Sequence, residues 1–218
     1  MRASPTCLQD AIRSAEWRRE LKCYIQILRG LHSATHSRWQ DVSKCVMELE
    51  KLAQSPLSGI IGLYSIYLSG VYRQGTGELE LADSIYRHPI LSLDHDKGAQ
   101  RACKQAESDV RLLAAFNRIW IMQHEDRRDD QMTNELLEQL RPLCQSHANQ
   151  EIRTLWHLVI AATQTNPPLP MTSLKTNLSL ALNGAKVLGD VQTLSMALNL
   201  MRAKLFHDII GEIGRAHV

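Results

Sequence analysis

The chain has 218 residues, of which 44% are hydrophobic, so it is long enough to bury a core in one large domain or two small ones. With 25 basic and 23 acidic residues, its formal charge of +2 gives no strong field to hold nucleic acid or an anionic membrane by charge alone. Only 5% of the residues are aromatic, and the abundance of Leu, Ala, Gln, Arg and Glu favours helices over sheets. Composition therefore excludes fibrous and disordered proteins, disfavours dedicated DNA binding and predicts an all-α fold.

The cysteine pattern indicates a reducing compartment, because the 5 cysteines are widely spaced and form no C-x-x-C pair. They are Cys7, Cys23, Cys45, Cys103 and Cys144. We expect each to be a small buried apolar residue. No apolar run approaches the roughly 18 residues of a membrane span, and the charged N-terminal region does not resemble a signal peptide, so a soluble intracellular protein is expected.

Apolar residues recur at steps of three and four along the first part of the chain, as they do in amphipathic helices. Helices are expected over about 17–35 and about 38–54, then through 63–72 and 81–86, which would give two antiparallel hairpins. The residues expected to share the apolar face of the first helix are Leu21, Tyr24, Leu28 and Leu31, and those of the second are Val42, Cys45, Val46, Leu49 and Leu52.

The helical pattern continues after a polar loop at 94–98. A longer helix is followed by the charged stretch 125–130, whose mixed signs predict a solvated turn, and the last hairpin turns at Gly189-Asp190. We therefore expect about nine helices in a right-handed stack of about four hairpins plus a terminal helix. The aromatic residues expected to be at least partly buried between the layers are Trp39, Tyr72, Tyr86, Trp120 and Trp156.

One hairpin follows the tetratricopeptide order of large apolar, small, aromatic, turn glycine, small and aromatic residues, with about one residue inserted at the turn. The matching residues are Leu68, Ser69, Tyr72, Gly75, Ala82, Tyr86 and Pro89. Small residues in this order let paired helices approach, while the aromatic residues fill the space between successive hairpins. A poorer second match involves Gly30, Trp39 and Val42. Together they predict a tetratricopeptide-like helical-repeat superhelix.

Histidine pairs are the strongest candidates for a metal site. His32 and His36 have the i, i+4 spacing of two zinc ligands, but a third carboxylate, His or Cys would be needed nearby, and no Glu follows His32 as a zincin would require. The dipeptides His95-Asp96 and His207-Asp208 are similar to the metal-binding pair of all-α phosphohydrolases, although no aspartate follows the second one. Surface histidines are the preferred interpretation, and an all-α metal-dependent phosphohydrolase using His95-Asp96 is kept as an alternative.

Two clusters of charged residues could either bind a ligand or partner or simply be exposed to solvent. Asp126, Asp129 and Asp130 could hold magnesium from a helix that faces an apolar cavity, but the arginines between them favour a solvated loop. A basic cluster near the start could contact an acidic partner or phosphate, whereas Glu16 and Glu20 within it favour an ordinary exposed face. Its members are Arg13, Arg18, Arg19, Lys22 and Arg29. Phosphate-loop, dinucleotide-binding and nucleophile motifs are absent from the sequence, so no catalytic, cofactor-binding or metal-binding residue is predicted.

Five runs of residues, taken in order, resemble the C-terminal half of fungal cohesin loading factors, which are tetratricopeptide subunits of the cohesin loader complex. The runs are Trp17 to Leu28, Ser69 to Gly77, Asn117 to Met122, Leu140 to Cys144 and Thr165 to Pro170. The resemblance extends from about Trp17 to Glu212, and the ordered combination is more specific than any single run.

This resemblance implies a non-enzymatic scaffold subunit, without cofactor or metal, that supports sister chromatid cohesion. In the family the helical superhelix wraps the extended N-terminal segment of the large HEAT-repeat loader subunit, and the pair loads cohesin rings onto chromatin. The implied location is the nucleus, on chromatin, with the cytoplasm left open, and neither membrane association nor direct sequence-specific DNA binding is expected. A tetratricopeptide adaptor of another intracellular complex is the alternative. The sequence does not identify the residues that contact the partner.

Three segments are expected: a poorly defined N-terminal segment at 1–16, a helical-repeat domain at 17–212 and an artefactual terminus at 213–218. The frame ATC GGA AGA GCA CAC GTC TGA encodes Ile213 to Val218 and a stop, and it matches a common sequencing adapter. Because family members are several hundred residues long, the resemblance implies that an N-terminal array of repeats is missing. The chain should then bind its partner weakly and expose an apolar flank where the array was cut.

Overall fold

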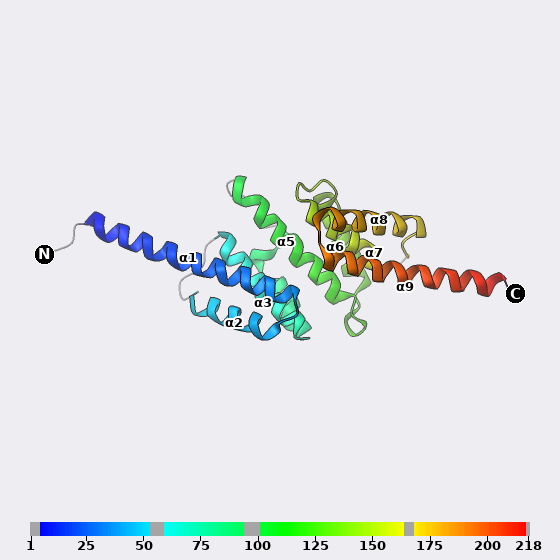
Figure 1. Ribbon diagram of the computed structural model, residues 1–218, viewed down its shortest axis with the longest axis horizontal. Coiled ribbons are helices and arrows are strands. Elements are labelled where there is room, and N and C mark those ends of the chain that lie inside the picture. The colour runs from blue at the N-terminus through cyan, green and yellow to red at the C-terminus, as the bar shows by residue number, and fades with distance from the viewer. Residues whose placement is uncertain (1–4, 53–58, 94–100, 164–167, 217–218) are drawn as a thin grey trace. The chain divides into compact units, whose positions relative to one another are not determined.

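The computed structural model describes the backbone of residues 5–52, 59–93, 101–163 and 168–216, and the side chains of 13–52, 59–93, 105–124, 126–163 and 168–204. Over these residues the chain forms nine α-helices and no strand (Figure 1). This confirms the predicted all-α helical-repeat fold. The chain divides into two compact units, Met1–Ala114 and Ala115–Val218.

The first unit contains four complete helices and the beginning of a fifth. They are α1 (Pro5–Thr35), α2 (Trp39–Leu52), α3 (Gly59–Gly75), α4 (Leu79–Tyr86), a 3-10 turn η1 (Pro89–Leu91) and the first part of α5 (Arg101–Met122). α1 packs on α2 and α3, and α3 packs on α4 (Figure 1). The first helix begins at Pro5, well before the expected start near residue 17. Buried Arg111 of α5 pairs with Glu107 and donates from Nε to the carbonyl oxygen of Ile90, 3.1 Å away, which ties η1 to α5.

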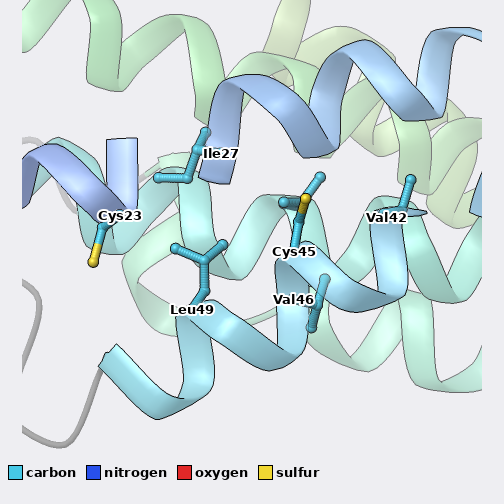
Figure 2. Close-up of a cluster of buried hydrophobic side chains, with 7 residues drawn as sticks. Cys23, Ile27, Val42, Cys45, Val46 and Leu49 are labelled. Atoms are coloured by element: carbon cyan, nitrogen blue, oxygen red, sulfur yellow. The ribbon is translucent and has the colours of Figure 1, made fainter. Parts of the chain in front are cut away.

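A cluster of buried apolar side chains joins α1, α2 and α3 (Figure 2). Its members are Cys23, Ile27, Val42, Cys45, Val46, Leu49 and Leu68. The apolar face predicted for the second helix is confirmed by the members from α2 and by Leu52, which packs against the cluster. Full burial of one large aliphatic side chain stabilises a fold by roughly 1.5–3 kcal/mol, so this cluster holds the three helices together.

The apolar face predicted for the first helix is wrong in three of its four positions. Leu21, Tyr24 and Leu28 are 41%, 47% and 50% exposed. Only Leu31 packs against the cluster, and α1 buries Cys23 and Ile27 in place of the others. Because apolar residues occupy more than half of the circumference of α1, periodicity alone could not select the part that faces the core.

The second unit begins in α5 and contains four further helices. It includes a 3-10 turn η3 (Glu125–Arg127), α6 (Asp130–Gln145), α7 (Gln150–Ala162), α8 (Met171–Leu188) and α9 (Val191–Ala216). α7 packs on both α6 and α8, and α9 packs on α7 and α8. The contacts among α7, α8 and α9 include two buried clusters, one around Leu158, Ala181, Leu182 and Ala197, the other around Ala161, Leu174 and Leu178.

Polar side chains define the ends of the helices in the second unit. The Asn149 side chain accepts from the backbone N–H of Glu151 at 2.9 Å, and Asp190 accepts from that of Thr193 at 3.0 Å. Gly189 has φ of 68°, a left-handed conformation that glycine adopts without strain, and it closes α8. The predicted turn at Gly189-Asp190 is therefore confirmed, with each residue in a distinct capping role.

The five aromatic residues expected inside the fold are all at least partly buried, as predicted. Tyr86 is 2% exposed, and Trp156 is 1% exposed and stacks on Phe116 with ring centroids 6.3 Å apart. Trp39 lies against Gly75, where a Cβ would overlap the indole ring. The absence of a side chain at Gly75 is therefore what lets α2 approach the end of α3.

The contact between Gly75 and Trp39 gives a stability prediction. We expect Gly75→Leu to lower the free energy of unfolding by about 1–3 kcal/mol, since the added side chain must displace the indole ring. Urea unfolding of Gly75→Leu in the wild-type and Trp39→Ala backgrounds measures the effect. The loss should shrink to below about 0.5 kcal/mol once the ring is removed, because only the clash couples the two sites.

Gln40→Leu is a suitable control, since it places a leucine at an exposed position of α2 and should change stability by less than about 0.5 kcal/mol. An equal loss from Gly75→Leu in both backgrounds would contradict the packing explanation.

Candidate protein-interaction surface

The described residues contain no group of three His, Cys, Asp or Glu side chains that could hold a metal ion. The rings of His32 and His36 lie tilted against each other with centroids 4.6 Å apart, and Nδ1 of His36 lies 2.9 Å from the carbonyl oxygen of His32. The His95-Asp96 pair lies outside the described residues, as do the side chains of His207-Asp208. Local contacts therefore account for the one histidine pair whose side chains are described.

The aspartates of the 125–130 stretch serve local structure. Asp129 accepts from the backbone N–H of Met132 at 2.9 Å and caps α6, while Asp130 pairs with Nε of Arg128 at 2.8 Å. Asp126 is exposed within η3. Two of the three carboxylates are thus engaged by neighbouring groups, which agrees with the predicted solvated turn.

The α3–α4 hairpin brings together the residues of the tetratricopeptide pattern. Leu68 and Ala82 are fully buried, and the hydroxyl of Tyr86 donates to Oε1 of Gln74 at 3.0 Å. Ser69 donates to the carbonyl oxygen of Ser65, while Tyr72 packs against the buried cluster of Figure 2. These residues support the packing of the hairpin.

Gly70 was missed by the sequence pattern, which assigned the small position to Ser69. A Cβ at Gly70 would overlap the ring of Tyr86, so Gly70 is the residue that lets α4 approach α3. The signal was present in the sequence as a glycine beside the expected serine.

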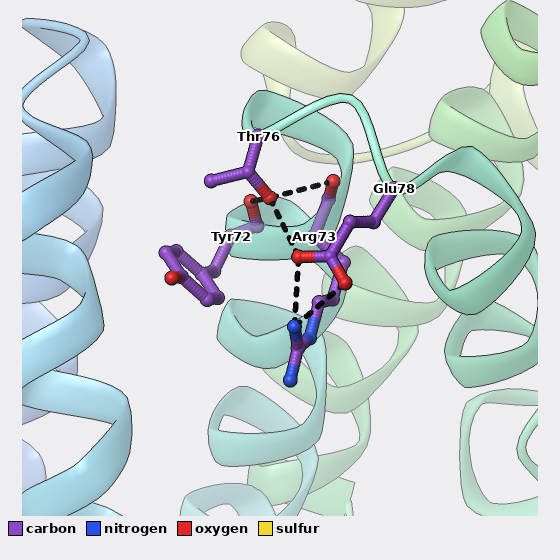
Figure 3. Close-up of polar contacts among 4 residues, drawn as sticks. All are labelled: Tyr72, Arg73, Thr76 and Glu78. Carbon is purple, nitrogen blue, oxygen red and sulfur yellow. Dashed lines mark hydrogen bonds and ion pairs between the residues drawn. The ribbon is translucent and has the colours of Figure 1, made fainter.

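Three polar side chains close the turn between α3 and α4 (Figure 3). Arg73 donates from Nη1 to both carboxylate oxygens of Glu78, at 2.7 and 2.8 Å, and the hydroxyl of Thr76 lies 3.1 Å from Oε1 of the same carboxylate. The hydrogen bond from Arg73 lowers the pKa of Glu78, and the same bond raises the pKa of Arg73. The ion pair therefore restrains the turn that sets the pairing of the two helices.

Three cysteines, Cys23, Cys45 and Cys144, are buried free thiols. Burial raises the pKa of each of them, and that of Cys144 to about 12. The side chains of Cys7 and Cys103 lie outside the described residues. The described cysteines thus occupy the buried apolar positions predicted for them and lack the lowered pKa of a reactive thiol.

The most extensive unusual feature of the first unit is an apolar row on the surface of α1. We call it the α1 apolar row; it consists of Trp17, Leu21, Tyr24 and Leu28, which are 64%, 41%, 47% and 50% exposed. Their spacing of four, three and four residues places them on one face of the helix. These four side chains therefore form an exposed apolar face on α1.

A second row of exposed side chains runs beside the first, because each of its residues directly follows a residue of the apolar row in the sequence. Its residues are Arg18, Lys22, Ile25 and Arg29, all exposed, and we call its three cations the α1 basic row. The sequence pattern identified these cations but placed the neighbouring apolar residues in the core. The structure instead places both rows side by side on the surface, a combination suited to binding another protein.

The length of α1 contributes to this exposure. α1 has 31 residues and spans about 46 Å, whereas α2 has 14 residues and spans about 21 Å. In Figure 1 the blue N-terminal part of α1 extends beyond the ends of α2 and α3. The shorter helices therefore cover only part of the length of α1. None of the described helices combines the length and apolarity that crossing a membrane requires.

A comparison with protein families found that the family model described as "Cohesin loading factor" matches residues 1–218. Comparisons with curated proteins and with solved structures found no significant match. The match covers both units and includes all the residues of α1 described above.

Thiol labelling tests the burial of the cysteines. We expect iodoacetamide to label Cys23, Cys45 and Cys144 more than about a hundredfold more slowly in the native protein than in urea, because burial limits access and suppresses the thiolate. Peptide mass spectrometry after timed labelling measures each site separately. Rapid native labelling of Cys144 would contradict its position in the core.

The Arg73–Glu78 ion pair predicts a pH dependence of the α3–α4 turn. The pKa of Glu78 is lower in the folded chain than in the unfolded one, so its stabilising contribution is complete above the unfolded pKa and is lost as the pH falls through the folded pKa. Carboxyl carbon NMR titration should find this lowered pKa and its return to the ordinary range in Arg73→Gln. Arg141→Gln, in the second unit, is the matched control. An unchanged Glu78 titration in Arg73→Gln would contradict the assignment.

Proposed function

Because the chain belongs to the cohesin loading factor family, we propose that it acts as a non-enzymatic scaffold subunit of a cohesin loader complex. Family membership gives the protein a role in cohesin loading, which is a nuclear process linked to chromatin. The scaffold role is the proposed refinement. The observation that carries it is the family match over residues 1–218 of a chain whose described part is built from packed helices.

The proposed partner is the extended N-terminal segment of a large HEAT-repeat loader subunit. Packed helical hairpins offer many side chains along their surface, and an extended segment can gain affinity from many distributed contacts that offset the cost of ordering it. The His32–His36 pair, Asp129 and the three described cysteines have local structural contacts or are buried, which favours a binding role over a metal or thiol site at these residues. Support for sister chromatid cohesion would then come through the partner.

We also propose that the chain corresponds to the C-terminal half of a fungal member of the family. The support is the ordered set of residue runs from Trp17 to Pro170. On this proposal a longer family member supplies additional surface, so the present chain binds the HEAT-repeat subunit more weakly.

We also propose that residues 213–218 are an artefactual terminus. Sequencing the transcript across the codons for 208–218 tests this proposal, and a genomic match to the final six codons would contradict it.

Capture of the purified HEAT-repeat subunit tests the scaffold proposal directly. We expect the tagged 218-residue chain to retain the full-length HEAT-repeat subunit at low salt and to lose it when the N-terminal segment of that subunit is deleted. The longer family member should retain the same subunit at higher salt, since it offers more contacts. Bound and free fractions measured over a salt series compare the two chains.

Two controls separate this proposal from its alternatives. An unrelated HEAT-repeat protein of similar charge should not be retained, and elemental analysis of the purified chain should find no stoichiometric transition metal. Equal capture of the full-length and truncated HEAT-repeat subunits would contradict the proposed binding segment. A longer family member that captures no cohesin-loading component would leave only a general adaptor role.

A further inference from the structure

The two rows on α1 combine an exposed apolar strip with a positively charged edge, which are the two properties that a docking surface for an amphipathic helix with acidic residues needs. The α1 apolar row extends over 12 residues of one helix, Trp17 to Leu28, or about 16 Å between its first and last Cα atoms. The α1 basic row runs parallel to it at the next helical position. A straight ridge of this length is matched by about three turns of another helix whose apolar residues follow the same spacing.

The cations beside the apolar row are not neutralised within the described part of the chain. Arg18, Lys22 and Arg29 form no ion pair or hydrogen bond with any described residue. Glu16 and Glu20 lie on the other side of the apolar row, towards the buried face, and Glu20 is partly buried. One long edge of the apolar row is therefore positive and available to an acidic side chain.

The α1 apolar row is poorly suited to pairing with α1 of a second copy of the chain. The α1 apolar row covers fewer than two heptads, whereas a self-sustaining coiled coil needs about three or four. In a parallel pair, Arg13 and Arg18 would occupy the flanking positions that meet across the interface, which places like charges opposite each other. The charge pattern is better matched by a partner that carries acidic residues.

We propose that the α1 apolar row and the α1 basic row together bind an amphipathic helix of a separate protein, with acidic residues along the edge that meets Arg18, Lys22 and Arg29. Burial of Trp17 and Leu21 provides the affinity, and the cations fix the direction and register of the bound helix. This surface is distinct from the proposed binding of an extended segment and does not depend on it. The partner is thus defined by its helical form, its apolar spacing and its acidic edge.

A pair of designed peptides tests the chemistry of the surface. The first is an amphipathic helix with leucines at i, i+4, i+7 and i+11 and glutamates along one edge, and the second replaces those glutamates with lysines. We expect the full chain to bind the acidic peptide at least tenfold more tightly in fluorescence anisotropy at low salt. Three exposed charge pairs, each of modest strength, account for a difference of about this size.

Charge reversal on the protein provides the matched test. The variant Arg18→Glu, Lys22→Glu, Arg29→Glu should bind the acidic peptide about tenfold more weakly and gain affinity for the lysine peptide. The control variant Lys175→Glu, Lys186→Glu, Arg202→Glu makes the same change in net charge at exposed positions of the second unit and should leave both affinities unchanged. Circular dichroism establishes that both variants keep their helix content. An equal effect of both variants would overturn the proposal, since it would reflect net charge alone.

Crosslinking identifies the source of the bound helix. Benzoylphenylalanine placed at Trp17 of the full chain should crosslink, in cell extract, to an acidic amphipathic helix of another protein, and a synthetic copy of that helix should require the α1 basic row for binding. A crosslink to a second copy, to another segment of the same polypeptide, or to no protein overturns the proposal. Retained binding of the HEAT-repeat subunit by the charge-reversed variant would show that the two surfaces act separately, and the scaffold proposal is judged by that capture alone.

Discussion

Helix α3 approaches three neighbouring helices closely, and the first unit depends on these contacts. In each contact a glycine faces a large side chain across the helix pair. The three pairs are Gly30 with Leu68, Gly70 with Tyr86 and Gly75 with Trp39. Because helix axes can approach only where side-chain volume is removed, the glycines set the distances from α3 to α1, α4 and α2. A methyl group at Gly70 or Gly75 would have to displace an aromatic ring, and one at Gly30 would have to displace the end of the Leu68 side chain.

The central position of α3 determines what the other helices must bury. α3 has only one charged residue, Arg73, which lies in its last turn and pairs with Glu78. The rest of its surface is available for packing, so α1 and α2 need to bury only the sides that face α3 and each other. The apolar residues on the opposite side of α1 are therefore not required for this core. Their presence needs a different explanation from folding of the described first unit.

The sequence predicted helix positions well and helix faces unevenly. For α2 the apolar residues form one narrow stripe, so only one rotation about the helix axis buries them, and the predicted face is correct. For α1 the apolar residues from Cys23 to Ile25 and from Ile27 to Leu28 lie on several sides, and burial was decided by the glycine contact at Gly30. Contacts between helices are not encoded in the periodicity of either one. The same limit explains why Ser69 was chosen over Gly70, since a shift of one residue turns a helix position by about 100°.

The candidate surface was only half predictable for the same reason. The basic residues near the start of the chain were visible in the sequence, and Glu16 and Glu20 among them favoured an ordinary solvated face. That interpretation treated the residues as one mixed cluster. On the helix the glutamates and the cations Arg18, Lys22 and Arg29 lie on opposite sides of the α1 apolar row, so the charges are separated in space although they alternate in sequence. Linear order concealed the separation that gives the surface its one positive edge.

The small net charge of the chain and the charge of this edge act over different distances. A net charge of +2 cannot attract a partner from afar, because salt screens exposed charges beyond about 8–10 Å. Three cations within about 16 Å of each other along one helix still act at contact, where water is excluded by neighbouring apolar side chains. For a partner docking on this face, apolar burial must therefore supply most of the binding energy, while the cations discriminate between acidic and basic edges. The small net charge argues against an electrostatic field strong enough to hold nucleic acid. It is nevertheless compatible with selective recognition of a partner by one face of α1.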